Sequence, residues 1–483
     1  MNLLHILSDQ HARHVAGCYG DGVVRTPNLD RLAARGVTFD NAYATSPICV
    51  PARMSALTAR HAFRQDCWTN TDYLASDIPA FGHALGAAGL APVLVGRLHA
   101  MGPDQLHGYA RREIGDHSPN WFGIPRHDLG VLDKANDPWR EGIAKSGPGR
   151  SAYEVKDEAV VASAVAVLRE LAAAGRPFAL TVGLMLPHAP YVAAPADYAR
   201  YAGRVPPPRR APPAEDHPWI GWWRANRGLD TVTQAECMRA RAAYYGLVDR
   251  LDRMVGELLD ALEASGAAGD TLVVYTSDHG DQIGERGLWW KHTFYEESLG
   301  VPMILAGPGL PRGERRGQVV NLMDLTQAML AATGAPLLPD ADGRSLWTLA
   351  QDGEAPWIDE TFAEYCTDDT PAWTGGMAVR QRMIRQGRWK LAYYHGYRPQ
   401  LFDLAADPGE MLDLGTSPAH AGVRDALLAR LLADWDPAAI DARMRRALPG
   451  KAVIAEWARR TAPASTYLWP LDPAMNRLDP PPG

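Results

Sequence analysis

The sequence of 483 residues has no long apolar run, few cysteines and no dense tract of basic residues. A membrane-spanning helix needs about 20 consecutive apolar residues, and no run of about 18 occurs, so we expect no spanning segment. The net charge of -7 disfavours a nucleic-acid-binding protein. The odd number and wide scatter of the cysteines argue against a disulfide framework, and none has the paired spacing of a zinc site. They are Cys18, Cys49, Cys67, Cys237 and Cys366.

The amino terminus also lacks a basic segment and a small-residue cleavage site. Residues 3–7 read as a first strand instead, so we expect no signal peptide and a cytoplasmic protein. A hydrophobic content of 46% and a charged content of 22% are typical of a globular protein. The length favours one large domain with a smaller one.

Short apolar runs alternate with helical patterns, which predicts an α/β fold with a mainly parallel sheet covered by helices on both faces. The expected strands are residues 3–7, 91–95, 178–184, 271–276 and 302–305, and the expected helices are residues 28–35, 51–60, 79–88, 157–174 and 235–265. The irregular segments 111–150 and 201–227 are expected to shape a substrate mouth.

The pattern of apolar and polar residues changes from about residue 385. Strands over 389–394 and 400–404 and a helix over 423–435 predict a small C-terminal α+β subdomain with an antiparallel sheet. The predicted organisation is a catalytic domain over 1–376, this subdomain over 377–448 and an extended tail over 449–483. The tail lacks core-like periodicity, so we expect it to pack on another surface, with contact to substrate or to another copy in a homo-oligomer.

Cys49 precedes Pro51, which suits the first turn of a helix. The cysteine would then lie at a helix N-terminus, where unpaired backbone N–H groups favour an anion. Arg53 lies about one turn further on and can reach back over Cys49. The alternative interpretation of this segment is an ordinary buried thiol before a helix.

Two acidic residues follow predicted strands, Asp9 after the first and Asp278 after the fourth. Ligands gather at the carboxyl ends of strands in such sheets, so we expect both in one cleft. With the neighbouring Gln10 and His279 they offer mostly oxygen donors, which suit Ca²⁺, Mg²⁺ or Mn²⁺. The alternative for such a dipeptide is a cap or a turn.

Taken together, these motifs resemble the sulfatase family of the alkaline-phosphatase superfamily over nearly the whole chain. The shared segments are residues 26–32, 49–53, 187–191, 278–280, 342–346 and 401–404, with Lys291. The resemblance implies an alkaline-phosphatase-like sandwich and formylglycine made from Cys49 by a formylglycine-generating enzyme. It implies one divalent metal, most simply Ca²⁺, and two sets of site residues: Asp9, Gln10, Asp278, His279 and Cys49 for the metal, and Cys49, Arg53, His99, His188 and Lys291 for catalysis.

In the mechanism that this resemblance implies, one hydroxyl of the formylglycine hydrate attacks the sulfur of a sulfate monoester and the alcohol leaves. The second hydroxyl then loses a proton, and the bond from carbon to sulfate breaks to restore the aldehyde. Arg97 stands where the family usually has lysine, and its planar guanidinium changes how it can grip sulfate. Ala52 and Ala59 replace a frequent serine and a frequent glycine.

Residues 102–109, 284–289 and 476–479 look most like choline sulfatases. A quaternary ammonium group requires aromatic faces and nearby negative charge, and the substrate-binding candidates are Arg97, Asn70, Trp121, Glu364 and Asp479. His117 and His127 have no motif support. Two alternatives remain: a phosphonate monoester hydrolase or phosphodiesterase of the same superfamily, and a non-catalytic anion- or metal-binding protein whose Cys49 is never oxidised.

Overall fold

The computed structural model describes residues 1–136, 138–368 and 378–480. Its large sheet has eight strands in the order β10-β2-β9-β8-β1-β6-β3-β4. These are β1 (Asn2–Asp9), β2 (Val37–Tyr43), β3 (Val93–Gly96), β4 (Arg111–Glu113), β6 (Ala179–Pro187), β8 (Thr271–Ser277), β9 (Met303–Ala306) and β10 (Glu314–Asn321). All five predicted strands are present, and the first lies at the centre of the sheet, parallel to both neighbours.

One strand runs against the others. β9 pairs antiparallel with both β8 and β2. The chain remains at the carboxyl end of the sheet after β8, so it enters β9 from that end and has to run back. The sheet is therefore mixed but mainly parallel, as the sequence predicts.

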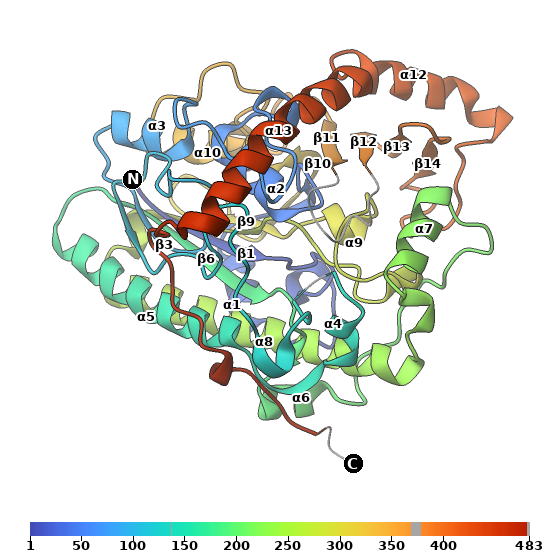
Figure 1. Ribbon diagram of the computed structural model, residues 1–483. Coiled ribbons are helices and arrows are strands. Elements are labelled where there is room, and N and C mark those ends of the chain that lie inside the picture. The colour runs from blue at the N-terminus through green and yellow to red at the C-terminus, as the bar shows by residue number, and fades with distance from the viewer. Residues whose placement is uncertain (137, 369–377, 481–483) are drawn as a thin grey trace.

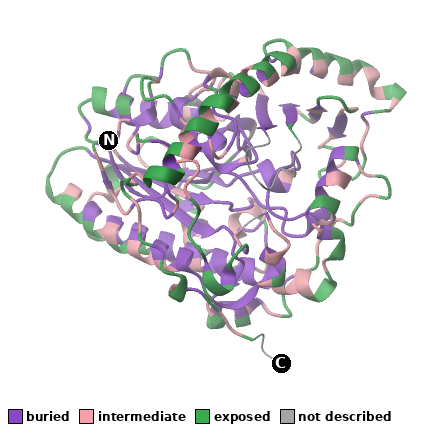
Figure 2. Cartoon of the chain, in the orientation of Figure 1, coloured by how far each residue is buried: buried purple, intermediate pink, exposed green. Residues whose placement is uncertain are grey.

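Helices cover both faces of this sheet (Figure 1). One face carries α1 (Pro27–Ala34), α5 (Ala152–Ala173) and α8 (Gln234–Ala264), and the other carries α2 (Cys49–Thr58), α3 (Phe81–Ala87) and α10 (Leu322–Thr333). Shorter helices are α4 (Glu141–Ala144), α6 (Pro195–Tyr201), α7 (Pro218–Asn226), α9 (Glu296–Leu299) and α11 (Trp347–Gln351). The burial pattern places the core between these layers, where the central strands and the facing sides of the helices are buried (Figure 2).

Helix α5 begins five residues earlier than predicted. The side chain of Ser151 accepts a hydrogen bond from the backbone N–H of Glu154, which is a standard N-cap. Among the described helices, none has both the length and the apolar character that crossing a bilayer requires. All five cysteines are free thiols.

A second, antiparallel sheet contains β11 (Glu360–Thr367), β12 (Val379–Gln386), β13 (Trp389–Tyr394) and β14 (Gln400–Asp403). Helix α12 (Ala421–Leu432) packs on it through Leu427 and Leu431. This is the predicted α+β subdomain, but its first strand comes from the range 1–376. The predicted boundary at residues 376 and 377 itself lies outside the described residues.

The prediction of an extended tail from residue 449 is wrong for its first part. Helix α13 (Pro437–Thr461) continues through Pro449, because its remaining residues are mostly strong helix formers. Beyond this helix the chain runs along its own catalytic domain past α5 (Figure 1). There β15 (Arg477–Leu478) pairs with β5 (Gly147–Arg150), which also pairs with β7 (Val192–Ala193), and the side-chain oxygen of Asn476 accepts from the backbone N–H of Ala152 at 2.7 Å.

Candidate active site

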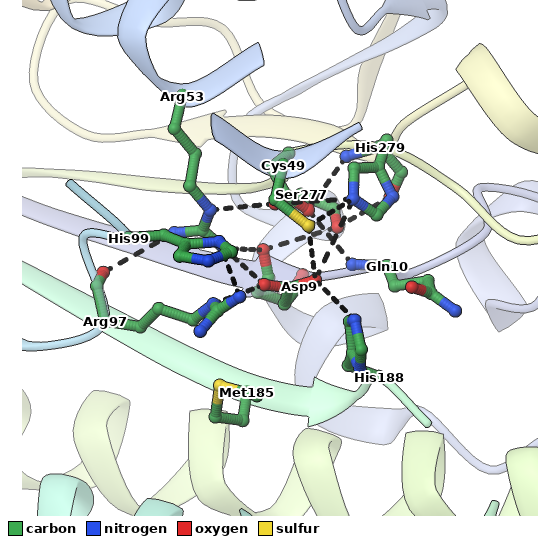
Figure 3. A network of polar contacts seen from close by, with 12 residues as sticks. Asp9, Gln10, Cys49, Arg53, Arg97, His99, Met185, His188, Ser277 and His279 are labelled. Carbon is green, nitrogen blue, oxygen red and sulfur yellow. Dashed lines mark hydrogen bonds and ion pairs between the residues drawn. The ribbon is translucent and has the colours of Figure 1, made fainter. Parts of the chain in front are cut away.

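Four buried side chains meet at the carboxyl end of the central strands (Figure 3). Asp9 ends β1, Asp278 and His279 follow β8, and Cys49 begins α2. Ser8 and Ser277 are register partners in the sheet, so the two strands deliver their acids to the same edge. Candidate ligand atoms of all four residues lie within 4.8 Å of one another. The structure thus brings together the two acids and the cysteine from distant parts of the sequence.

The donors of this cluster fit a divalent metal ion. His279 directs Nδ1 at the carbonyl oxygen of Gly280, 3.1 Å away, so Nδ1 carries the proton. Its Nε2 faces Sγ of Cys49 at 3.1 Å and keeps its lone pair for a ligand. Burial lowers the pKa of His279 to about 4, so the ring is neutral at neutral pH. Two carboxylates and a neutral imidazole around one point are a donor set for a hard or borderline divalent ion.

Two buried arginines form ion pairs with these carboxylates. Arg53 donates from Nε to Asp278 at 2.8 Å and from Nη2 to Asp9 at 3.0 Å. Arg97 donates from Nε to the same oxygen of Asp9 at 2.5 Å. Burial alone raises the pKa of Asp9, but Arg97, Arg53 and Lys291 together hold that pKa well below its usual range. Arg53 therefore contacts both acids, and Arg97 contacts one of them.

Lys291 and His188 flank Cys49. The ammonium group of Lys291 lies 3.3 Å from Sγ of Cys49, 3.1 Å from Nε2 of His188 and 2.7 Å from the amide oxygen of Gln10. His188 directs Nδ1 at the carbonyl oxygen of Ala189 at 2.6 Å, so its Nε2 is the unprotonated nitrogen that accepts from Lys291. Burial, followed by the charge of Lys291, holds the pKa of His188 well below its ordinary value.

His99, the third predicted histidine, has the opposite tautomer from His188. Arg97 donates from Nη2 to Nδ1 of His99 at 2.7 Å, and a guanidinium can only donate, so the proton of this ring lies on Nε2. His99 has a backbone φ of +60°, a left-handed conformation that costs energy for a residue with a side chain. Asp116 holds it there by accepting from the backbone N–H of His99 at 2.9 Å, while Arg112 donates to the same carboxylate oxygen at 2.6 Å.

Sequence reasoning missed two carboxylates that organise this site. Asp281 accepts from the amide nitrogen of Gln10 and from the hydroxyl of Tyr191, both at 2.7 Å. Asp281 could have been found from the sequence, because it lies three residues after Asp278. No sequence pattern indicated Asp116, because it lies in an irregular segment and binds the backbone of His99, 17 residues earlier.

A cavity of about 670 Å³, including its open mouth, leads down to Cys49. Its wall combines site residues with several described residues of the segment 111–150 and one residue of the tail. The lining residues are Cys49, Asn70, Arg97, His99, His117, Ser118, Arg126, His127, Leu129, Asn136, Pro138, Tyr153, Met185, His188, Lys291, His292 and Leu471. The segment 111–150 thus shapes the mouth as predicted. The segment 201–227 does not, because it turns toward the small sheet, where His217 contacts the carbonyl oxygen of Arg398.

Of the predicted substrate-binding residues, Arg97 and Asn70 line this cavity, and Asn70 also accepts from the backbone N–H of Val50 at 3.0 Å. The other three do not line it. Trp121 packs edge-on against Trp457 of α13, with 4.9 Å between the ring centroids. Glu364 is buried in β11 and accepts from the indole N–H of Trp435 at 3.0 Å, and Asp479 pairs with Arg477 at 2.8 Å. Each already has a partner within the chain, so the predicted cation pocket is not formed from them.

The chain matches a family model described as "Sulfatase" over residues 1–335 and one described as "N-sulphoglucosamine sulphohydrolase, C-terminal" over residues 284–435. It is 32% identical to a choline-sulfatase of Rhizobium meliloti (strain 1021), over 99% of this chain and 95% of that protein. It is 29% identical to the multifunctional alkaline phosphatase superfamily protein PehA of Trinickia caryophylli, over 83% and 88%. Its fold is similar to that of the phosphonate monoester hydrolase of Agrobacterium radiobacter, with a TM-score of 0.73, 22% identity, and 92% and 95% coverage.

Proposed function

We propose that this chain, which belongs to the sulfatase family and is a sulfuric ester hydrolase, cleaves a small sulfate monoester with a nucleophile made by oxidation of Cys49 to formylglycine. One observation carries the proposal. Cys49 begins α2 inside the buried cluster of Asp9, Asp278 and His279, with Lys291 against its sulfur atom and His188 hydrogen-bonded to Lys291. A hydrated aldehyde in that position is surrounded by groups that can stabilise negative charge and move protons.

Asp9, Asp278 and His279, with the modified residue 49, would hold one divalent ion, for which Ca²⁺ is our first choice and Mg²⁺ or Mn²⁺ the others. Such an ion supplies Lewis-acid stabilisation of negative oxygen atoms when it is bound. Arg53 holds the two carboxylates in position through its two charge-assisted hydrogen bonds. The amide oxygen of Gln10 is a further donor for the ion once Lys291 turns to the substrate.

The cations around Cys49 would bind the sulfate group. Lys291 and Arg97 balance charge on its nonbridging oxygens, and both are buried, so their interaction with an anion is strong. His99 points a protonated Nε2 and His188 an unprotonated one, which gives the site one donor and one acceptor. We assign the Nε2–H of His99 to donate a hydrogen bond to the leaving oxygen, and His188 to take the proton from the second hydroxyl of residue 49.

Cys49 is only 1% exposed, so a formylglycine-generating enzyme would have to act before the chain folds around it. The residues that such an enzyme reads, Cys49, Pro51 and Arg53, are all present. Conversion of Cys49 to formylglycine must then precede folding. Protein that folds first would keep a thiol that is no substrate for conversion.

A second candidate is a phosphonate monoester hydrolase or phosphodiesterase. The pair Asp9 and Gln10 is the specific feature that favours it, because it resembles the Asp-Gln pair that such hydrolases carry at the first metal motif. A sulfate monoester and a phosphodiester each bring one negative charge to the site. The same cluster can therefore act on either ester.

The test compares kcat/KM for an aryl sulfate, choline O-sulfate and a phenyl phosphonate monoester on protein whose conversion at residue 49 is established by peptide mass. We expect the sulfates to dominate. Dominance of the phosphonate would replace the proposed substrate class by the second candidate. Converted protein that turns over none of the three esters would contradict both.

A further inference from the structure

The charges on the cavity wall are of one sign. Its lining includes Arg97, Arg126 and Lys291 but no carboxylate among the described residues. Arg97 is occupied by Asp9, and Lys291 by Gln10 and His188. Arg126 lies exposed in the mouth, and no described carboxylate forms an ion pair with it. Among the residues that the structure describes, the positive charge of Arg126 in the mouth is therefore not neutralised.

A buried polar group faces the same space. His117 lines the cavity and is only 7% exposed, and its Nδ1 has no hydrogen-bond partner among the described residues. Its Nε2 contacts the hydroxyl of Ser118 at 3.3 Å. A buried ring nitrogen without a partner is costly, so a polar group that reached Nδ1 of His117 would remove that cost. Asn136 and His127 add polar groups beside it.

This wall is unsuited to a cationic substrate. A quaternary ammonium group is bound by aromatic faces and negative charge. Tyr153 is the only Tyr, Trp or Phe side chain among the described lining residues, and Trp121, Glu364 and Asp479 are engaged elsewhere. A cation placed near Arg126 would be repelled.

We propose that the substrate carries a second anionic group, remote from the sulfate ester, and that Arg126, with His117 and His127, binds this group at the cavity mouth. The group is a carboxylate or a second sulfate, since both accept the paired hydrogen bonds that a guanidinium donates. This inference rests on the proposed function, because it names the substrate class of the same site. It sets this chain apart from a hydrolase of choline O-sulfate.

The test uses two aryl sulfates of the same shape, 3-carboxyphenyl sulfate and 3-carbamoylphenyl sulfate, with the para-substituted pair as a second spacing. We expect kcat/KM to be about tenfold higher for the carboxylate than for the carboxamide, because a charge-assisted pair forms only with the former. The ratio should fall as salt rises, since Arg126 is exposed. Choline O-sulfate should be a poorer substrate than either.

Arg126→Gln should bring this ratio close to one, because kcat/KM for the carboxylate should fall about tenfold more than kcat/KM for the carboxamide. Arg176→Gln is the matched control, because Arg176 is an exposed arginine outside the cavity lining. A ratio of one or less in the wild-type enzyme, or a ratio that survives Arg126→Gln, would overturn the inference while sulfatase activity stands.

Binding separates this inference from the proposed function. If no ester is turned over, the affinity of unconverted protein for the same two esters still reports on the mouth. Tighter binding of the carboxylate, lost in Arg126→Gln, supports the anion site even then. Equal binding of both esters contradicts it.

Discussion

The contacts of Asp116 predict that it is the main support of the sulfate-binding side of the site. Its carboxylate accepts from the backbone N–H of His99, from Arg112 and, at 3.4 Å, from the backbone N–H of Leu98. Its other oxygen lies 3.6 Å from Nη1 of Arg97. The residue is 3% exposed, so these interactions are little screened by solvent.

The change Asp116→Asn keeps the shape and removes the charge. Arg112 and Arg97 would then be buried next to a neutral amide, and breaking a buried ion pair from one side costs about 3–5 kcal/mol. The amide can still accept one hydrogen bond, so we expect the low end, about 3 kcal/mol. Loss of the fixed positions of Arg97 and His99 should also lower kcat/KM for an aryl sulfate by about 10- to 100-fold, as is typical when a supporting partner is removed.

The assay is calorimetric melting and steady-state kinetics on the same samples. Asp260→Asn is the matched control, because Asp260 also pairs with an arginine but at an exposed site, where ion pairs contribute little. We expect a melting temperature lowered by several degrees and an altered pH profile of kcat/KM in Asp116→Asn alone. Melting and kinetics indistinguishable from the control would refute the positioning role.

Three further predictions follow from single groups. Lys291→Ala should lower kcat/KM for an aryl sulfate by about 10²- to 10³-fold with little change in melting, as for loss of a charge-stabilising donor; a change below about fivefold would contradict its role. Burial raises the pKa of Glu364 from 4.5 to about 7. The unfolded chain therefore loses this proton at lower pH than the folded chain, so this group's contribution to stability is full below about pH 4.5 and lost as pH rises through 7. The melting temperature of wild-type protein should fall from pH 5 to pH 8 relative to Glu364→Gln, and parallel curves would refute this. Chelation should abolish activity and lower the melting temperature, and a divalent ion should restore both; full activity and an unchanged melting temperature in metal-free protein would contradict the metal site.

The layered fold could be predicted because its central strands are short, mostly apolar and separated by helical patterns. The strand β2 could not, since Thr38, Asp40 and Asn41 interrupt its apolar pattern and its place is set by pairing with β9 and β10. The antiparallel direction of β9 depends on where the preceding loop lies in space. Helix α13 was missed because Pro449 reads as a stop.

The same contrast holds at the site. Asp9 and Asp278 could be placed together because both follow strands of one sheet. The part that segment 111–150 plays in the cavity wall could be predicted, but the individual lining residues, such as His117 and Leu471, could not, because they come from segments without periodicity. Local sequence could not show that Trp121, Glu364 and Asp479, proposed for a cation pocket, each have a partner within the fold and do not line this cavity.

The central claim is that Cys49 becomes the nucleophile of a sulfatase. The most direct measurement is the specific activity on an aryl sulfate across preparations in which the converted fraction of residue 49, read from peptide mass, ranges from none to nearly all. The account predicts activity proportional to that fraction and no activity in unconverted protein or in Cys49→Ala. Equal activity in converted and unconverted protein would contradict it.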